Sequence, residues 1–184
     1  MKRIIIILLS LLSMTSSFAQ VQNTFFNGAI LGKSDMQTTY SIMANYFGEV
    51  PSNFFGILSM KEPIYAQYKW DAINAHFHNG KFAQVNLRYF TDGYAKRSSD
   101  NIYHRYLSLK QSLDNKYKGR VKAYKLPENP GEEGFYYYDG RYAVSLTLIY
   151  RIAKNQKVYT ETQLWYWDAK LMNESEKPQI NNDL

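Results

Sequence analysis

Two histidines, His76 and His78, stand two positions apart in a segment that is predicted to be a strand, so both imidazoles are expected on one face. Such a pair can hold Zn²⁺ when a third ligand joins it. His104, Asp71 and Asp92 are the candidates for that ligand. An exposed sheet face that happens to carry two histidines is the better explanation of the pair. We therefore predict neither a metal nor a cofactor, and His76 and His78 remain the metal candidates.

Four aspartates, Asp71, Asp92, Asp139 and Asp168, lie at or near the ends of predicted strands. Two carboxylates about 5 Å or about 7–9 Å apart, flanked by aromatic rings, can hydrolyse a glycosidic bond. Two of the four precede a glycine, however, and Asp-Gly is an ordinary turn sequence. A small glycan hydrolase that uses paired carboxylates is therefore an alternative function.

Aromatic side chains crowd the C-terminal part of the chain, where Tyr136, Tyr138, Trp165 and Trp167 fall on predicted strands. Alternation along a strand places Trp165 and Trp167 on one face. A sheet that helices cover on one side leaves its other side in water. Exposed Trp and Tyr side chains there would bind a sugar ring or a protein partner. These four residues are the predicted binding residues, and the alternative is that they belong to the core.

The sequence contains no recognisable catalytic motif. It has no Gly-rich phosphate loop and no Gly-x-Ser-x-Gly elbow. It has no Cys, which excludes a Cys nucleophile and a disulfide framework. We therefore predict a non-catalytic binding or interaction domain rather than an enzyme. An envelope structural or assembly protein is a further alternative.

The N-terminus has the three parts of a secretory signal peptide. Two positive charges precede residues 4–12, which are apolar except for Ser10, and Ser17-Phe18-Ala19 supplies small residues three and one before the cut. The apolar run is too short for a membrane span, which needs roughly 20 residues. We predict that residues 1–19 are removed and that the mature protein, starting at Gln20, is periplasmic or secreted and has no membrane span.

The charge of the chain is mildly positive. It has 22 Lys and Arg against 16 Asp and Glu, and no block of five or more basic residues occurs. Nucleic acid is therefore not a predicted partner. The predicted partner is a protein or a glycan. The sequence leaves the oligomeric state open.

Two amphipathic helices are predicted, over about residues 34–47 and 100–118. Ser34 is the expected N-cap of the first helix, because its hydroxyl can accept the free N–H three residues further on. Gly48 is the expected end, because glycine readily adopts the left-handed conformation that stops a helix.

The remaining segments alternate as strands do. Asn79-Gly80 between two alternating runs predicts a hairpin, since both residues accept positive φ. Phe82 is out of phase with the apolar positions that follow it, which indicates a bulge. Residues 64–70 alternate throughout and are predicted to form one strand.

The order helix, glycine, strand, hairpin occurs twice, and residues 46–48 match residues 117–119 at an offset of 71. The predicted divisions are residues 20–93, residues 94–172 and a disordered tail, 173–184. Each half is a helix with about three strands, too small to bury its own face, so the two share one core. Chance similarity among Tyr-rich strands is the alternative. The predicted fold class is α+β, with two helices packed on antiparallel sheet.

This element order resembles that of secreted tandem α/β inhibitors of the β-lactamase inhibitor protein type. It also resembles the helix-plus-three-strand domains of outer-membrane assembly lipoproteins. The resemblance covers most of the mature chain and implies a fold, but it identifies no site residue. Those inhibitors have disulfides and those lipoproteins an acylated Cys, whereas this chain has no Cys. The Phe18-Ala19-Gln20 end of the signal resembles that of exported Bacteroidota proteins.

Overall fold

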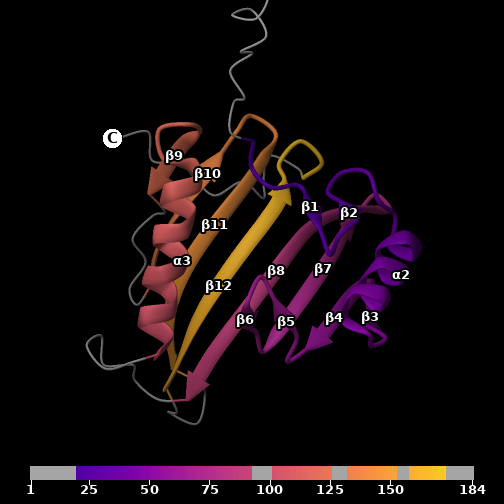
Figure 1. Cartoon of the computed structure of the whole chain (residues 1–184), viewed down its shortest axis with the longest axis horizontal. Helices are drawn as coiled ribbons and strands as arrows, with labels where there is room; N and C mark the ends of the chain where they lie inside the picture. Colours follow the sequence, from indigo (N-terminus) through magenta and orange to yellow (C-terminus); the bar gives the residue numbers. More distant parts are fainter. Residues whose placement is uncertain (1–19, 93–100, 126–131, 153–157, 173–184) are drawn as a thin grey trace, which may run out of the picture.

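The computed structural model of the 184-residue chain describes residues 20–92, 101–125, 132–152 and 158–172. The predicted signal peptide and the predicted C-terminal tail lie outside these residues. The described residues form one large sheet, two small hairpins and two helices. Figure 1 shows the helices and hairpins in front of one face of the large sheet.

The main sheet has eight strands, all paired antiparallel. In order across the sheet they are β3 (Ser52–Phe54), β4 (Ile57–Lys61), β7 (Ala72–His78), β8 (Lys81–Asp92), β12 (Val158–Asp168), β11 (Tyr142–Ile152), β10 (Glu132–Tyr138) and β9 (Lys122–Lys125).

Each half of the main sheet follows one helix. α2 (Met36–Phe47) precedes β3, β4, β7 and β8, and α3 (Asn101–Tyr117) precedes β9 to β12. The last strands of the two halves, β8 and β12, pair in the middle, where Leu87 lies opposite Leu164. The fold class is α+β, as predicted, but each half contributes four strands to the main sheet where about three were expected.

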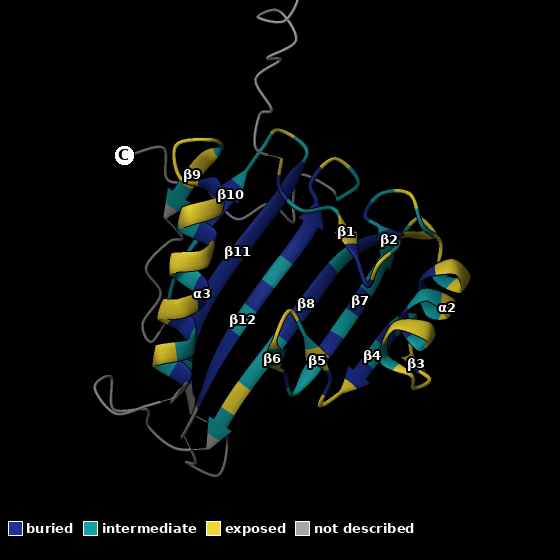
Figure 2. Cartoon of the chain, in the orientation of Figure 1, coloured by how far each residue is buried: buried dark blue, intermediate teal, exposed yellow. Residues whose placement is uncertain are grey.

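The core lies on the face of the main sheet that the helices cover. Val85 and Leu87 of β8 and Leu164 of β12 are buried there against Met43 of α2 and Leu113 of α3. Figure 2 shows that burial is most continuous along β11 and β12. Full burial of one such side chain stabilises the fold by about 1.5–3 kcal/mol. Because the chain has no cysteine, this burial takes the place of a disulfide framework.

α2 begins one residue later than predicted. Asp35 is its N-cap, since Asp35 Oδ1 accepts a hydrogen bond from Thr38 N at 2.7 Å. Ser34 Oγ instead accepts one from Ile30 N at 2.9 Å. Both residue types can cap a helix, and the turn that precedes α2 engages the serine. Gly48, with φ 71°, ends the helix as predicted.

Two small hairpins lie beside the helices: β1 (Thr24–Phe25) with β2 (Ala29–Ile30), and β5 (Ile64–Tyr65) with β6 (Tyr68–Lys69). The second hairpin contradicts the prediction of one strand over residues 64–70. The chain reverses at Ala66 and Gln67, whose φ angles are 49° and 70°. Two-residue turns of this kind favour Asn and Gly, so the sequence carries no turn signal here.

The hairpin predicted at Asn79-Gly80 is confirmed. Both residues have positive φ, and His78 pairs with Lys81 across the turn. The predicted bulge is also present. The adjacent residues His76 and Phe77 of β7 pair with Gln84 and Phe82 of β8, so β8 has one extra residue between its two paired positions. Ala83 is the extra residue, and it allows Phe82 and Val85 both to reach the core.

Candidate functional site

The face of the main sheet opposite the helices is called the open face here, because no helix or hairpin of the described residues packs on it. One residue from each strand forms a continuous row across this face, the central row. From β9 to β3 its members are Tyr124, Tyr136, Ser145, Trp165, Asn86, Asn74, Ser59 and Ser52. The row changes from aromatic rings at one end to amides and hydroxyls at the other.

A second row runs beside the central row on the open face. Its members from β9 to β7 are Lys122, Tyr138, Ala143, Trp167, Gln84 and His76. All four predicted binding residues therefore lie on the open face, in two adjacent rows.

Small residues on β11 leave room for the aromatic rings of its neighbours. The rings of Tyr136 and Trp167 approach to 6.2 Å between centroids, over the buried Ala143. Tyr124 stacks on Tyr136 at 4.7 Å, with 19° between the ring planes. These rings form a small second cluster, separate from the main core.

The indole of Trp165 lies across the sheet rather than upright on it. Its ring centroid is 5.5 Å from that of His76, although β8 runs between the strands that carry them. Trp165 Nε1 donates a hydrogen bond to Gln163 Oε1 at 2.7 Å, which fixes the orientation of the ring. The indole therefore extends over β8, where Asn86 is the cross-strand partner of Trp165, and the side chain as a whole is half-buried.

Three polar atoms of the open face are buried and have no hydrogen-bond partner among the described residues: His76 Nε2, Asn86 Nδ2 and Thr147 Oγ1. Asn86 is only 2% exposed and Thr147 only 6%. Leaving such an atom without a partner costs about 1–3 kcal/mol. Burial also lowers the pKa of the His76 imidazole, which is therefore neutral at neutral pH.

An ion pair spans the two rows that follow the central row on the side away from the second row, with Arg88 on the nearer of them and Glu161 on the farther. Arg88 Nε contacts Glu161 Oε1, and the carboxylate is buried while the guanidinium is partly exposed. Arg88 is cross-strand neighbour to Gln163, which in turn holds Trp165. Charge, amides and aromatic rings are therefore contiguous on this face.

The predicted binding residues differ in exposure. Trp165 and Tyr138 are half-buried, whereas Trp167 is 8% and Tyr136 4% exposed. The prediction missed the amides Asn74 and Asn86, which complete the central row. Alternation on β7 and β8 could have placed both amides on one face, but not beside Trp165.

The aspartates proposed for hydrolysis hold loops and strand ends. Asp71 Oδ2 accepts a hydrogen bond from Phe90 N at 2.8 Å. Asp139 accepts from Val21 N at 2.8 Å and from two amides of its own turn. Asp168 pairs with Arg141 at 2.9 Å. The side chain of Asp92 lies outside the described residues. Carboxylates engaged in this way serve as structural anchors.

The described residues offer no metal site. No group of three or more His, Asp or Glu side chains in them could hold an ion. His76 instead packs against Trp165, and no third ligand joins it and His78 among these residues.

Within the described ranges, neither α2 nor α3 has the length and apolar character of a membrane-crossing helix.

Comparison of the chain with protein-family models, curated proteins and solved structures gives no match. The resemblance to secreted inhibitors and to assembly lipoproteins therefore stays a prediction.

Proposed function

We propose that this protein is an exported, non-catalytic binding domain that docks a protein partner on its open face. The observation that carries the proposal is the central row. It places the half-buried indole of Trp165 beside Asn86, whose buried amide nitrogen has no partner among the described residues. A bound partner would supply hydrogen-bond acceptors there and cover the exposed face of the indole.

The composition of the open face suits a protein interface. Tyr, Trp and Arg are enriched where proteins meet, and Tyr, Ser and Asn dominate antibody combining sites. Three of the eight residues of the central row are aromatic, two are Asn and three are Ser. Large rings give contact area at low entropic cost, while the amides and hydroxyls adapt to the partner.

The width of the face favours a macromolecule over a single sugar ring. Eight strands spaced about 4.8 Å apart span on the order of 30 Å. A typical protein interface buries about 800 Å² on each side, which a face of this width can supply. A sugar ring would use Trp165 and leave most of the row unoccupied.

Export is the second part of the proposal, and it rests on the predicted signal peptide. Val21, two residues after the predicted cut, is buried, and its N–H donates to Asp139. Cleavage after Ala19 would therefore leave the described domain whole. Mass spectrometry of the protein from its native host should find an N-terminal peptide that begins at Gln20. Soluble cytoplasmic protein that retains Met1 would contradict export.

The docking surface can be tested by comparative capture. Immobilised wild-type protein and two open-face variants, Trp165→Ala and Asn74→Arg, are exposed to envelope extract and culture medium of the host. Leu107→Ala is the control, because Leu107 is exposed on α3 on the opposite side of the sheet. The wild type and the control should retain a specific partner in similar amounts. Both open-face variants should retain at least about tenfold less of it.

The same proteins on a glycan array distinguish the second class of ligand. Glycan binding that both open-face variants lose would assign the face to saccharides and overturn the protein partner. A captured protein that binds all four forms equally would show that the open face is not the docking surface.

A further inference from the structure

A cleft on the helix-covered face separates α3 from the β5–β6 hairpin. Its volume is about 330 Å³, within the range of small-molecule sites, which is roughly 300–1,000 Å³. Leu87 and Leu164 of the main sheet line the cleft, as do Leu109 and Leu113 of α3. Figure 1 shows the hairpin in front of the middle strands, with α3 to one side of it. The cleft therefore has an apolar interior that suits a hydrocarbon chain.

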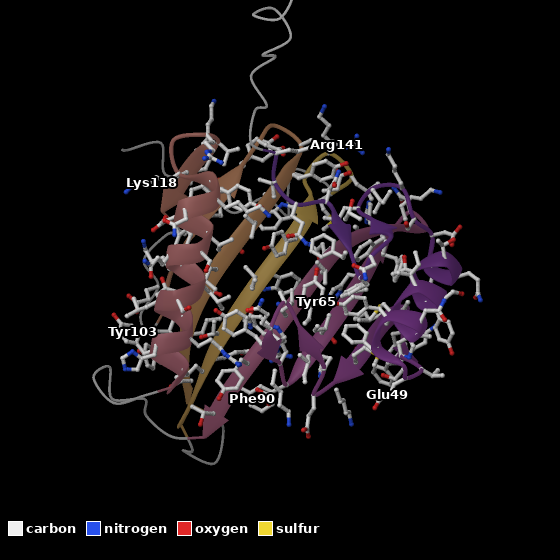
Figure 3. The ribbon with its side chains drawn as sticks, in the orientation of Figure 1. Glu49, Tyr65, Phe90, Tyr103, Lys118 and Arg141 are labelled. Atoms are coloured by element: carbon white, nitrogen blue, oxygen red, sulfur yellow. The ribbon has the colours of Figure 1, made fainter. Side chains whose placement is uncertain are left out.

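Polar contacts join the two sides of the cleft. The hydroxyls of Tyr68 and Ser108 lie 3.1 Å apart, linking the hairpin to α3. Gln22 makes a second link, since its Nε2 donates to the Tyr65 hydroxyl at 3.2 Å and its Oε1 lies 3.5 Å from Lys116 Nζ. Figure 3 shows Tyr65 on this face, in front of the middle strands. These links hold the cleft open at a fixed width.

Lys116 is the charged residue that lines the cleft. Its ammonium makes one hydrogen bond, the 3.5 Å contact to Gln22, and no carboxylate of the described residues pairs with it. Burial raises the pKa of Tyr65 to about 12, so its hydroxyl is neutral at physiological pH. An anion at this end of the cleft therefore meets a cation and neutral donors, with no opposing charge from the tyrosine.

Backbone strain lies at the edge of the cleft. Ala66 and Gln67 line it, and both hold the positive φ that residues with a Cβ avoid. Such residues are uncommon and concentrate at ligand sites. The strained turn places Tyr65 and Tyr68 opposite α3, where they complete the cleft.

We propose that the cleft between α3 and the β5–β6 hairpin binds a small amphipathic carboxylate. The hydrocarbon part lies on the leucines, and the carboxylate pairs with Lys116 and accepts from Gln22. This site is on the opposite side of the sheet from the open face, so it does not depend on the proposed docking function.

Calorimetric titration of the purified protein with decanoate and with decanol tests the charge preference. Decanoate should bind saturably, one molecule to each protein, and more tightly than decanol. Lys116→Gln should raise the dissociation constant of decanoate about fivefold, which is the effect of losing one exposed charge pair, and leave that of decanol unchanged. Lys118→Gln is the matched control, because Lys118 is exposed near the same end of α3 and does not line the cleft.

A steric block tests the location. Ser112→Trp should fill the cleft and abolish binding of both ligands, whereas Gln111→Trp, at the neighbouring exposed position of α3, should not. Amide NMR shifts locate the binding site on the wild-type protein, without any substitution. Decanoate should move the signals of residues 65–68 and 109–116 and leave those of Tyr124 and Ser52, on the edge strands of the open face, unmoved. Any one of three results would overturn the proposal: no saturable binding of decanoate, equal effects of the two lysine variants, or NMR shifts confined to the open face.

Discussion

Trp165 and Trp167 have the same residue type, strand and face, but their surroundings differ. Trp167 meets Tyr136 over Ala143 and is 8% exposed. Trp165 lies across β8 with one face half-exposed. The first indole therefore lies inside the second cluster, whereas the second packs against the edge of that cluster and keeps part of its surface accessible.

This difference predicts that the two alanine variants lose stability to different extents. Trp167→Ala should lower the free energy of unfolding by about 3 kcal/mol, because it leaves a cavity among packed rings. Trp165→Ala should lower it by about 1 kcal/mol or less and abolish partner capture. Urea denaturation followed by far-UV circular dichroism measures both. Equal losses of stability would show that Trp165 is also a core residue.

At the scale of elements, the β5–β6 hairpin lacks the residues that its turn favours. Its two-residue turn holds Ala66 and Gln67 at positive φ, whereas the comparable turn at residues 79–80 has Asn and Gly. Two contacts fix the hairpin. Trp70, which follows β6, donates from Nε1 to Tyr65 O at 3.2 Å, and Ser108 of α3 contacts the Tyr68 hydroxyl. Tertiary packing thus holds a turn that local preference disfavours.

Replacement of the turn by its preferred sequence should stabilise the protein. Ala66→Asn with Gln67→Gly should raise the free energy of unfolding by about 1 kcal/mol, because both residues accept the backbone angles already present. Thermal and urea denaturation measure the gain. Gln111→Gly, at an exposed position of α3, is the control. It should lower the free energy of unfolding by about 1 kcal/mol, because glycine destabilises the interior of a helix. A destabilised double variant would show that the turn residues make contacts the hairpin needs.

At the scale of the whole molecule, the N-terminal segment packs closely against an ion pair at the end of the main sheet, whose carboxylate is buried. Asp168 is fully buried, pairs with Arg141 and accepts from the amides of Lys170 and Leu171. A Cβ on Gly32 would lie 2.1 Å from Asp168 Oδ2 and 2.8 Å from Arg141 Nη2. The chain after β2 can reach the ion pair only because this residue has no side chain.

Gly32→Ala should therefore cost about 2–4 kcal/mol, because the added methyl displaces a buried carboxylate from its partner. Gly48→Ala is a close control. Its φ of 71° nearly equals the 75° of Gly32, but nothing lies within 4 Å of the added atom. The control should cost about 1 kcal/mol, from backbone strain alone. If urea denaturation gave the same loss of unfolding free energy for both variants, the ion pair would be able to move aside for the methyl group without cost.

Local patterns in the sequence predicted the two helices, the Asn79-Gly80 hairpin, the bulge beside Phe82 and the face shared by Trp165 and Trp167. Each depends on backbone geometry over a few neighbouring residues, which side-chain type and spacing determine. Only the tertiary structure placed Asn86 against Trp165, buried Trp167 and turned residues 64–70 into a hairpin. Pairing between distant strands is the sum of many small contacts between segments far apart in the chain, and no single segment encodes it.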